Sequence, residues 1–175
     1  IPSKKDTIHI ATKPMTEEFI IGEMLKQLIE DRTDLSVEIT KGVGGGTSNI
    51  HPAMVKGDFD MYPEYTGTSW SFVLKKKEIP EHDILYKELV REYKQQYHLE
   101  WTGLYGFNNT YGIAVTKETA QRYHLKTYAD LASVSSRMSF GAEYDYYERD
   151  DGYDAMVKAN DFHFKKSIDL DIGLK

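Results

Sequence analysis

The feature that most constrains this sequence is the alternation of strand-like and helix-like segments in its first 62 residues. The runs 7–12, 35–40 and 58–62 have the short apolar patterns of strands, and the segments 16–32 and 47–56 between them are helical in character. Strands that alternate with helices are joined by crossover connections, which set them parallel in one sheet with helices covering its faces. The chain is therefore predicted to be α/β.

The rest of the chain predicts a second unit of the same kind. After a long helix over 80–97, the segments 99–103 and 110–116 have strand-like patterns, and the second of these marks the entry to another lobe. No flexible linker separates the halves, so a boundary near Phe107 is expected to be a hinge between touching lobes. The lobes are then 1–107 and 108–175, and the second has further elements at 120–124, 128–134, 138–143, 150–160 and 167–170.

Composition and charge exclude several classes of protein. The 175 residues have a net charge of −6, which opposes non-specific binding to nucleic acid or to an anionic membrane. No apolar run approaches the roughly 18–20 residues that span a bilayer. The chain has no cysteine, which rules out disulfides, thiolate nucleophiles and cysteine–zinc sites within it. Its polar start predicts a trimmed or mature domain.

No cofactor, metal or catalytic residue is predicted. The glycine-rich segment 42–47 breaks the dinucleotide fingerprint at Thr47, and no Gly-Lys-Ser/Thr follows, so it is interpreted as a structural turn or as a place where backbone N–H groups meet an anion. The six histidines lack the spacings of metal ligands, and no serine lies in a nucleophile elbow.

Three segments place aromatic and hydrogen-bonding residues directly after a predicted strand. They are 62–68, 106–112 and 140–153. Ligands of open α/β sheets gather at the carboxyl ends of strands, so these segments are candidates for one shared site; the alternative is that their tyrosines only close the rims of helices. If the third segment ends a strand, Tyr144, Tyr146 and Tyr147 alternate between faces, and none of them is assigned to the site.

The order and content of these motifs resemble those of a known family. The most specific pieces are Pro-Glu-Tyr-Thr-Gly-Thr at 63–68 and Glu-Arg-Asp-Asp-Gly-Tyr at 148–153, and the series ends with Asp-Ile-Gly-Leu-Lys at 171–175. Together they are similar to the glycine betaine/carnitine/choline substrate-binding proteins of osmoprotectant ABC importers. The resemblance runs from about Ile8 to the last residue.

The resemblance implies a type II periplasmic-binding-protein fold, with two parallel-sheet lobes that close around ligand. Members of the family are longer, so the chain is expected to be truncated at its C-terminal end, with an incomplete second lobe. Open strand edges in such a lobe would favour self-association or marginal stability.

The resemblance also implies which residues meet the ligand. The family surrounds a trimethylammonium head with tyrosines, and the matching positions are Tyr65 and Tyr111. Arg149 matches an arginine that reaches a ligand carboxylate, with pairing to Glu148 or Asp150 as the alternative. The other motif positions near ligand are Lys13, Glu18, Thr68 and Asn109.

Physical chemistry agrees with these roles. A quaternary ammonium has no N–H donor, so it is held by aromatic faces, each worth about 0.5–2 kcal/mol. A guanidinium offers a planar fork to a carboxylate, which would favour betaine or carnitine over choline.

The implied function is an extracytoplasmic, non-catalytic binding domain at the cell surface or in the periplasm, which delivers its ligand to a membrane ABC permease and is held there by a lipid anchor or by fusion to that permease. One alternative is the same scaffold binding another betaine, such as ergothioneine, or a bulkier ligand. A second is a small α/β enzyme using Glu18, Glu64 or Asp145 as a base. A third is a module that only senses ligand or contacts proteins.

Overall fold

The computed structural model of the chain describes residues 6–170. They divide into two compact units, Ile1–Gly103 and Leu104–Lys175. The division lies close to the predicted boundary at Phe107, and the hinge between lobes stays a prediction. The last motif of the series, 171–175, lies outside the described residues.

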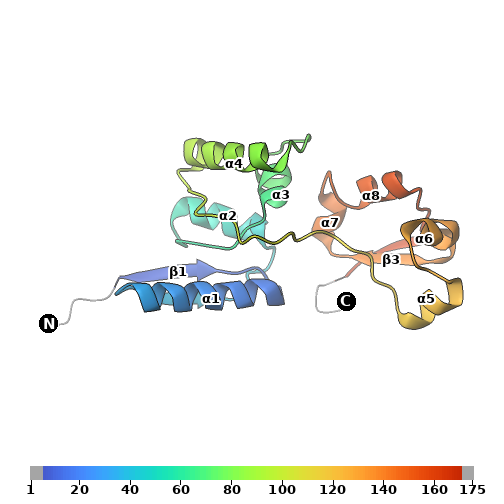
Figure 1. The fold of residues 1–175 in the computed structure, drawn as a ribbon, viewed down its shortest axis with the longest axis horizontal. Coiled ribbons are helices and arrows are strands. Elements are labelled where there is room, and N and C mark those ends of the chain that lie inside the picture. The colour runs from blue at the N-terminus through green and yellow to red at the C-terminus, as the bar shows by residue number, and fades with distance from the viewer. Residues whose placement is uncertain (1–5, 171–175) are drawn as a thin grey trace. The chain divides into compact units, whose positions relative to one another are not determined.

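The first unit is built on a parallel strand pair. β1 (Thr7–Ala11) and β2 (Ser36–Thr40) pair in parallel over their whole length. α1 (Thr16–Arg32) connects them and covers one face, and α2 (Thr47–Lys56) lies on the other side of the pair (Figure 1). This is the crossover arrangement that the alternating pattern predicts. The buried apolar side chains of these elements are Ile10, Ala11, Ile21, Val37 and Ile50.

The third predicted strand, 58–62, is reduced to one parallel bridge between β1 and Met61. The carboxylate of Asp60 accepts a hydrogen bond from the His9 N–H at 2.8 Å, so a backbone donor of β1 is used by a side chain. The proline after Tyr62 has no N–H with which to extend a ladder. The parallel direction was predicted correctly, and the length of the strand was not.

A helical layer completes the first unit. It consists of α3 (Thr66–Thr68), the π-helix η1 (Ser69–Val73) and α4 (His82–Tyr97). The Tyr93 hydroxyl donates to Ser69 Oγ at 2.7 Å and so ties α4 to η1. The buried core here consists of Trp70, Leu85, Leu89 and Tyr93.

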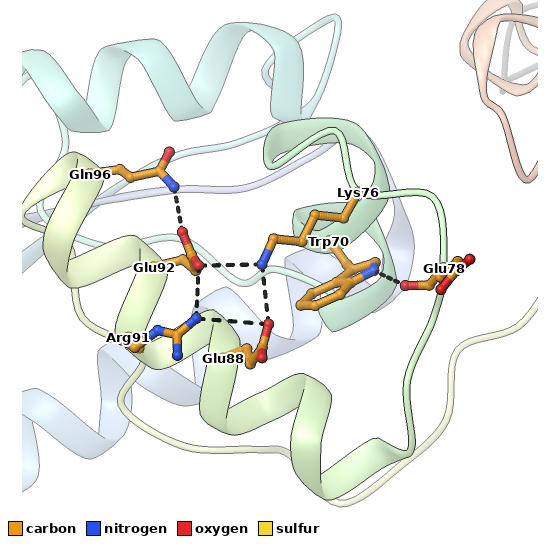
Figure 2. A network of polar contacts seen from close by, with 7 residues as sticks. All are labelled: Trp70, Lys76, Glu78, Glu88, Arg91, Glu92 and Gln96. Carbon is orange, nitrogen blue, oxygen red and sulfur yellow. Dashed lines mark hydrogen bonds and ion pairs between the residues drawn. The ribbon is translucent and has the colours of Figure 1, made fainter.

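A polar network on the surface of this layer joins η1 and its following loop to α4 (Figure 2). The Lys76 ammonium lies 4.4 Å from the centre of the Trp70 ring and bonds to the carboxylates of Glu88 and Glu92 at 3.1 and 3.3 Å. The Trp70 indole N–H donates to the backbone carbonyl of Glu78 at 2.7 Å. The network therefore fixes the segment that follows the 63–68 motif.

The segments 99–103 and 110–116 form no strand in the part of the chain that the structure describes. A strand needs a neighbour that satisfies its N–H and C=O groups, and neither of the described strand pairs extends to this stretch. The prediction of two strands there was wrong. The residues with the alternating pattern form an irregular and largely exposed connection.

The second unit repeats the parallel pairing on a smaller scale. β3 (Ser139–Ala142) pairs in parallel with β4 (Lys166–Asp169). Phe162, which precedes β4, is almost completely buried and contacts the rings of Tyr128 and Phe164. The other elements of this unit are α5 (Lys117–Tyr123), α6 (Tyr128–Val134), the 3₁₀ turn η2 (Ser135–Arg137), α7 (Tyr144–Glu148) and α8 (Tyr153–Asn160).

The segment after β3 is a short helix, not the end of a strand. α7 (Tyr144–Glu148) follows Glu143, which is extended, and Asp145 lies in the first turn, where a negative charge suits a helix start. Successive side chains of a helix diverge by about 100°, so the alternation of faces considered for a strand end does not apply to this segment.

Gly152 shapes the turn between α7 and α8. Its N–H donates to the Arg149 carbonyl at 3.0 Å. A side-chain carbon at this position would overlap the carbonyl oxygen of Tyr146. The turn 149–152 therefore requires glycine for close backbone approach.

Candidate ligand-binding residues

Tyr65 lies directly before α3 in the first unit, and a basic side chain covers its ring. The Lys13 ammonium lies 4.8 Å from the ring centre, within the range of a cation–π contact. The Tyr65 hydroxyl donates to the carboxylate of Glu17, and its backbone N–H donates to Glu64 at 2.8 Å. The backbone and the side-chain hydroxyl of Tyr65 are therefore both held by hydrogen bonds to glutamate carboxylates.

Lys13 forms a buried ion pair with Glu64. The two side chains are 8% and 5% exposed, and Thr47 at the start of α2 donates its hydroxyl to the same carboxylate at 2.7 Å. A buried charge is stable only when it is paired and hydrogen-bonded. Glu64 and Thr47 were not among the predicted ligand residues, although Glu64 lies inside the 63–68 motif that was singled out.

Glu18 is fully buried on the inner face of α1. Its Oε2 accepts the backbone N–H of Lys13 at 3.2 Å. Burial raises the pKa of this carboxyl to about 7, because desolvation penalises the charged form more than the nearby Lys13 ammonium favours it. Glu18 can therefore change its charge near neutral pH in the centre of this group.

An aromatic layer lies behind the ion pair. The His51 ring is buried and makes edge contacts with Tyr93 and Tyr97, at centroid distances of 5.5 and 4.6 Å. Desolvation lowers the pKa of His51 and raises that of Tyr62, and the negative charge of Glu64 opposes the first shift and adds to the second. Both groups are therefore favoured in their neutral forms, and the Lys13–Glu64 ion pair supplies the charges beside this layer.

Thr68 ends α3 and is half-buried. It lies one helical turn after Tyr65, because α3 and η1 continue as one run of helix from Thr66. The structure therefore brings Lys13, Glu18 and Tyr65 together, with Thr68 on the helix that directly follows Tyr65.

Tyr111 in the second unit also has a cation and a second ring beside it. Its side chain is 58% exposed. The Arg149 guanidinium lies 5.9 Å from its ring centre, and the Tyr146 ring lies 4.7 Å away at an angle of 59°. Partial desolvation raises the pKa of Tyr111, and the charge of Arg149 opposes this. Tyr146 was not assigned to the predicted site, because alternation along a strand did not show which face its ring takes.

Arg149 is paired with Asp151. Its Nε donates to Asp151 Oδ1 at 2.7 Å and its Nη2 donates to Oδ2 at 2.8 Å, which is a bidentate pair. The alternative partners expected from the sequence were Glu148 and Asp150, and neither is the partner in the structure. Sequence spacing missed it because the contact depends on the turn at Gly152.

Asn109 lies in the exposed irregular segment at the start of the second unit. The two other tyrosines of α7 do not join Tyr111. Tyr147 donates to the carbonyl of Ile168 at 2.8 Å, and Tyr144 is 60% exposed. Among the tyrosines of this helix, the ring contact with Tyr111 is made by Tyr146.

Within residues 6–170, no group of three or more metal-ligating side chains comes together. No helix in the described stretch has the length and apolar content needed to cross a membrane.

Comparison with known families identifies the class of protein. Residues 6–171 match the family described as the substrate-binding domain of ABC-type glycine betaine transport systems. The chain belongs to this family. Its α/β fold with parallel strands, as predicted, is the fold of substrate-binding proteins of ABC transporters.

Individual relatives differ in the ligand that their names give. The ergothioneine transport permease/ergothioneine binding protein EgtU of Helicobacter pylori is 44% identical over 166 residues, which are 95% of this chain and 30% of that protein. The carnitine transport binding protein OpuCC of Listeria monocytogenes is 37% identical over 174 residues, 98% of this chain and 56% of that protein. The chain thus spans about half or less of the length of these curated relatives.

A solved structure supports the fold. A crystal structure of a glycine betaine/carnitine/choline ABC transporter matches this chain with a TM-score of 0.67 and 30% sequence identity. The matched region covers 98% of this chain and 63% of the chain in that structure. The family and these relatives are binding proteins of transport systems rather than enzymes.

Proposed function

We propose that the chain captures a small quaternary-ammonium compound, such as glycine betaine, carnitine or choline, for uptake by an ABC importer, without converting it chemically. One observation carries the proposal: both tyrosines at the family's cage positions have a ring face near a cation, Lys13 over Tyr65 and Arg149 over Tyr111. Both rings therefore show the geometry of a cation–π contact, which is the contact that can hold a ligand cation without a hydrogen to donate.

The charges around each ring support the same ligand class. Lys13 is balanced by Glu64, and Arg149 is balanced by Asp151. Because each basic side chain is neutralised by a carboxylate, an added cation would not meet an uncompensated positive charge. From the family's motif positions, we propose that Tyr65 and Tyr111 supply aromatic faces for the trimethylammonium head, and that Arg149 acts on a carboxylate. Lys13, Glu18, Thr68 and Asn109 are proposed to act near the ligand.

Calorimetric titration tests this function. The chain, and a form extended to the length of its relatives, is titrated with glycine betaine, carnitine and choline, with glucose as an uncharged control solute. Trp70 follows the 63–68 motif and is 4% exposed, so its emission gives a second readout. Heat with the methylated amines alone is expected, and binding of glucose without any methylated amine would contradict the proposal.

Ergothioneine is the second candidate ligand. It is favoured by the 44% identity over 95% of the chain with the ergothioneine permease/binding protein. Ergothioneine is also a trimethylammonium betaine, so the same rings would hold its head. Competition separates the candidates: ergothioneine displacing bound carnitine at equal concentration would make it the preferred ligand.

The proposed partner of the loaded domain is a membrane ABC permease, and the proposed location is outside the cytoplasm. Attachment by a lipid anchor and attachment by fusion to the permease are both consistent with the family. The name of the Helicobacter relative joins a permease to a binding protein, and this chain covers 30% of it, which favours fusion.

Self-association is proposed as well. The side chains of Ile20, Met24 and Leu28 recur every fourth residue along α1 and are 57%, 64% and 55% exposed. An exposed apolar stripe of this kind favours contact with another protein surface. Sedimentation velocity at several concentrations measures it, and a concentration-independent monomer would contradict it.

A further inference from the structure

Asp151 occupies one edge of the guanidinium that the proposed function assigns to a ligand carboxylate. Both of its oxygens are used, accepting Arg149 Nε at 2.7 Å and Nη2 at 2.8 Å. A bidentate pair of this kind is the strongest arrangement a carboxylate can make with arginine. A ligand carboxylate that approaches Arg149 therefore meets a guanidinium that is already paired with the Asp151 carboxylate.

The position of Asp151 is set by the backbone. The turn 149–152 is closed by the Gly152 N–H, which donates to the Arg149 carbonyl at 3.0 Å, and by the close approach of Gly152 to the Tyr146 carbonyl. Arg149 is 11% exposed at its side chain and Asp151 31%. The pair is thus a built feature of the turn, unlike a surface pair between two long mobile side chains.

The charge of Asp151 acts on the predicted cage ring as well. Its negative charge raises the pKa of the Tyr111 hydroxyl, so its field reaches that side chain. The same field favours a cation beside the ring and disfavours a second carboxylate beside Arg149. In a partly buried site, two like charges a few ångströms apart repel by an amount that matters for affinity.

We propose that Asp151 is a specificity-determining residue, which shifts the preference of this domain from ligands that bear a carboxylate toward ligands that bear only the quaternary ammonium. The inference rests on the proposed function, and deepens it by naming the residue that tunes ligand charge. Arg149 attracts the carboxylate of betaine or carnitine, and Asp151 limits that attraction while it assists the trimethylammonium head.

The test compares the ratio of choline to glycine betaine dissociation constants in the whole chain and in three variants. Asp151→Asn removes the charge and keeps the shape, so betaine is expected to gain and choline to lose affinity, raising the ratio roughly tenfold. Arg149→Met is expected to lower the ratio. Asp150→Asn is the matched control, because Asp150 is the exposed neighbour and its loss changes net charge equally; its ratio is expected to stay within about twofold of the unmodified chain.

Near-ultraviolet circular dichroism checks that each variant is folded, and Asp151→Ser replaces Asp151→Asn if the latter is not. A ratio in the Asp151 variant that equals that of Asp150→Asn, or falls below it, overturns the inference while the proposed function stands. If the unmodified chain gives no heat with choline, glycine betaine or carnitine, the proposed function fails and the inference fails with it.

Discussion

The two units place the same three kinds of side chain together but bury them to different depths. In the first unit, Lys13 lies over the Tyr65 ring and is held by Glu64, with the charged side chains 8% and 5% exposed and Thr47 completing the hydrogen bonds. Thr47 comes from the start of α2, whereas Lys13 and Glu64 lie in the irregular segments that follow β1 and precede α3.

In the second unit, Arg149 lies over the Tyr111 ring and is held by Asp151, with 11% and 31% of these side chains exposed. The carboxylate comes from a turn two residues away. The first group is thus part of the interior of its unit, where an unpaired charge is costly, whereas the second is partly exposed and loses its charge at a smaller cost to the fold.

Removing one member of each ion pair gives the largest expected difference. Glu64→Gln leaves the Lys13 ammonium buried without its partner, and is expected to lower the free energy of unfolding by about 3 kcal/mol or more. Asp151→Asn is expected to cost about 1 kcal/mol or less, because that carboxylate is partly exposed. Urea denaturation of both variants measures this, and equal losses would refute the difference in burial.

Glu18 gives the first unit a pH dependence. Its folded pKa of about 7 lies above the ordinary pKa of a glutamate carboxyl, about 4.3, so the folded state holds a proton that the unfolded state releases. Stability is then highest below about pH 4.3 as far as this group is concerned, and is lost as the pH rises toward 7, by roughly 1–3 kcal/mol.

Thermal unfolding between pH 5 and pH 8 checks the sign of this effect. Glu18→Gln is expected to flatten the loss and to be more stable than the unmodified chain at pH 8. Glu23→Gln serves as the control, since that carboxylate lies on the same helix, is exposed, and has a pKa lowered by Lys41. A stability that rises with pH in the unmodified chain and not in Glu18→Gln would contradict the assignment.

Loss of either of the two tyrosine rings proposed to contact the ligand is expected to have a smaller effect, on ligand affinity rather than on folding. Tyr65→Ala and Tyr111→Ala are each expected to weaken choline, betaine and carnitine by about 0.5–2 kcal/mol. Tyr65→Phe keeps the ring and loses the hydroxyl that donates to Glu17, so it retains most of the affinity. Tyr144→Ala, at a 60% exposed ring, should leave binding unchanged; equal weakening by all of these alanine variants would show a non-specific effect.

The sequence predicted the local elements well and the long-range ones less well. The helix expected at 16–32 is α1 (Thr16–Arg32), and the strand expected at 7–12 is β1 (Thr7–Ala11). The strands expected at 99–103 and 110–116 are absent from the described residues. A helix satisfies its hydrogen bonds within its own segment, whereas a strand depends on a neighbour that its own residues do not specify.

The candidate site, like the fold, was predicted only in part. The motifs identified Tyr65, Lys13 and Glu18, and the structure places these close together. The Arg149–Asp151 pair and the Tyr146–Tyr111 contact were missed. Both depend on α7 being helical and on the turn that only Gly152 permits, and neither is visible in residue spacing.

The most direct test of the central claim, that aromatic rings hold a permanently charged head, compares choline with 3,3-dimethylbutan-1-ol, its uncharged isostere. The two molecules have nearly the same shape and hydroxyl group, and differ in the charge that a ring face attracts. Calorimetry is expected to show choline binding at least about tenfold more tightly, as one or two cation–π contacts would give. Equal affinity for the two, or tighter binding of the uncharged alcohol, would contradict the account.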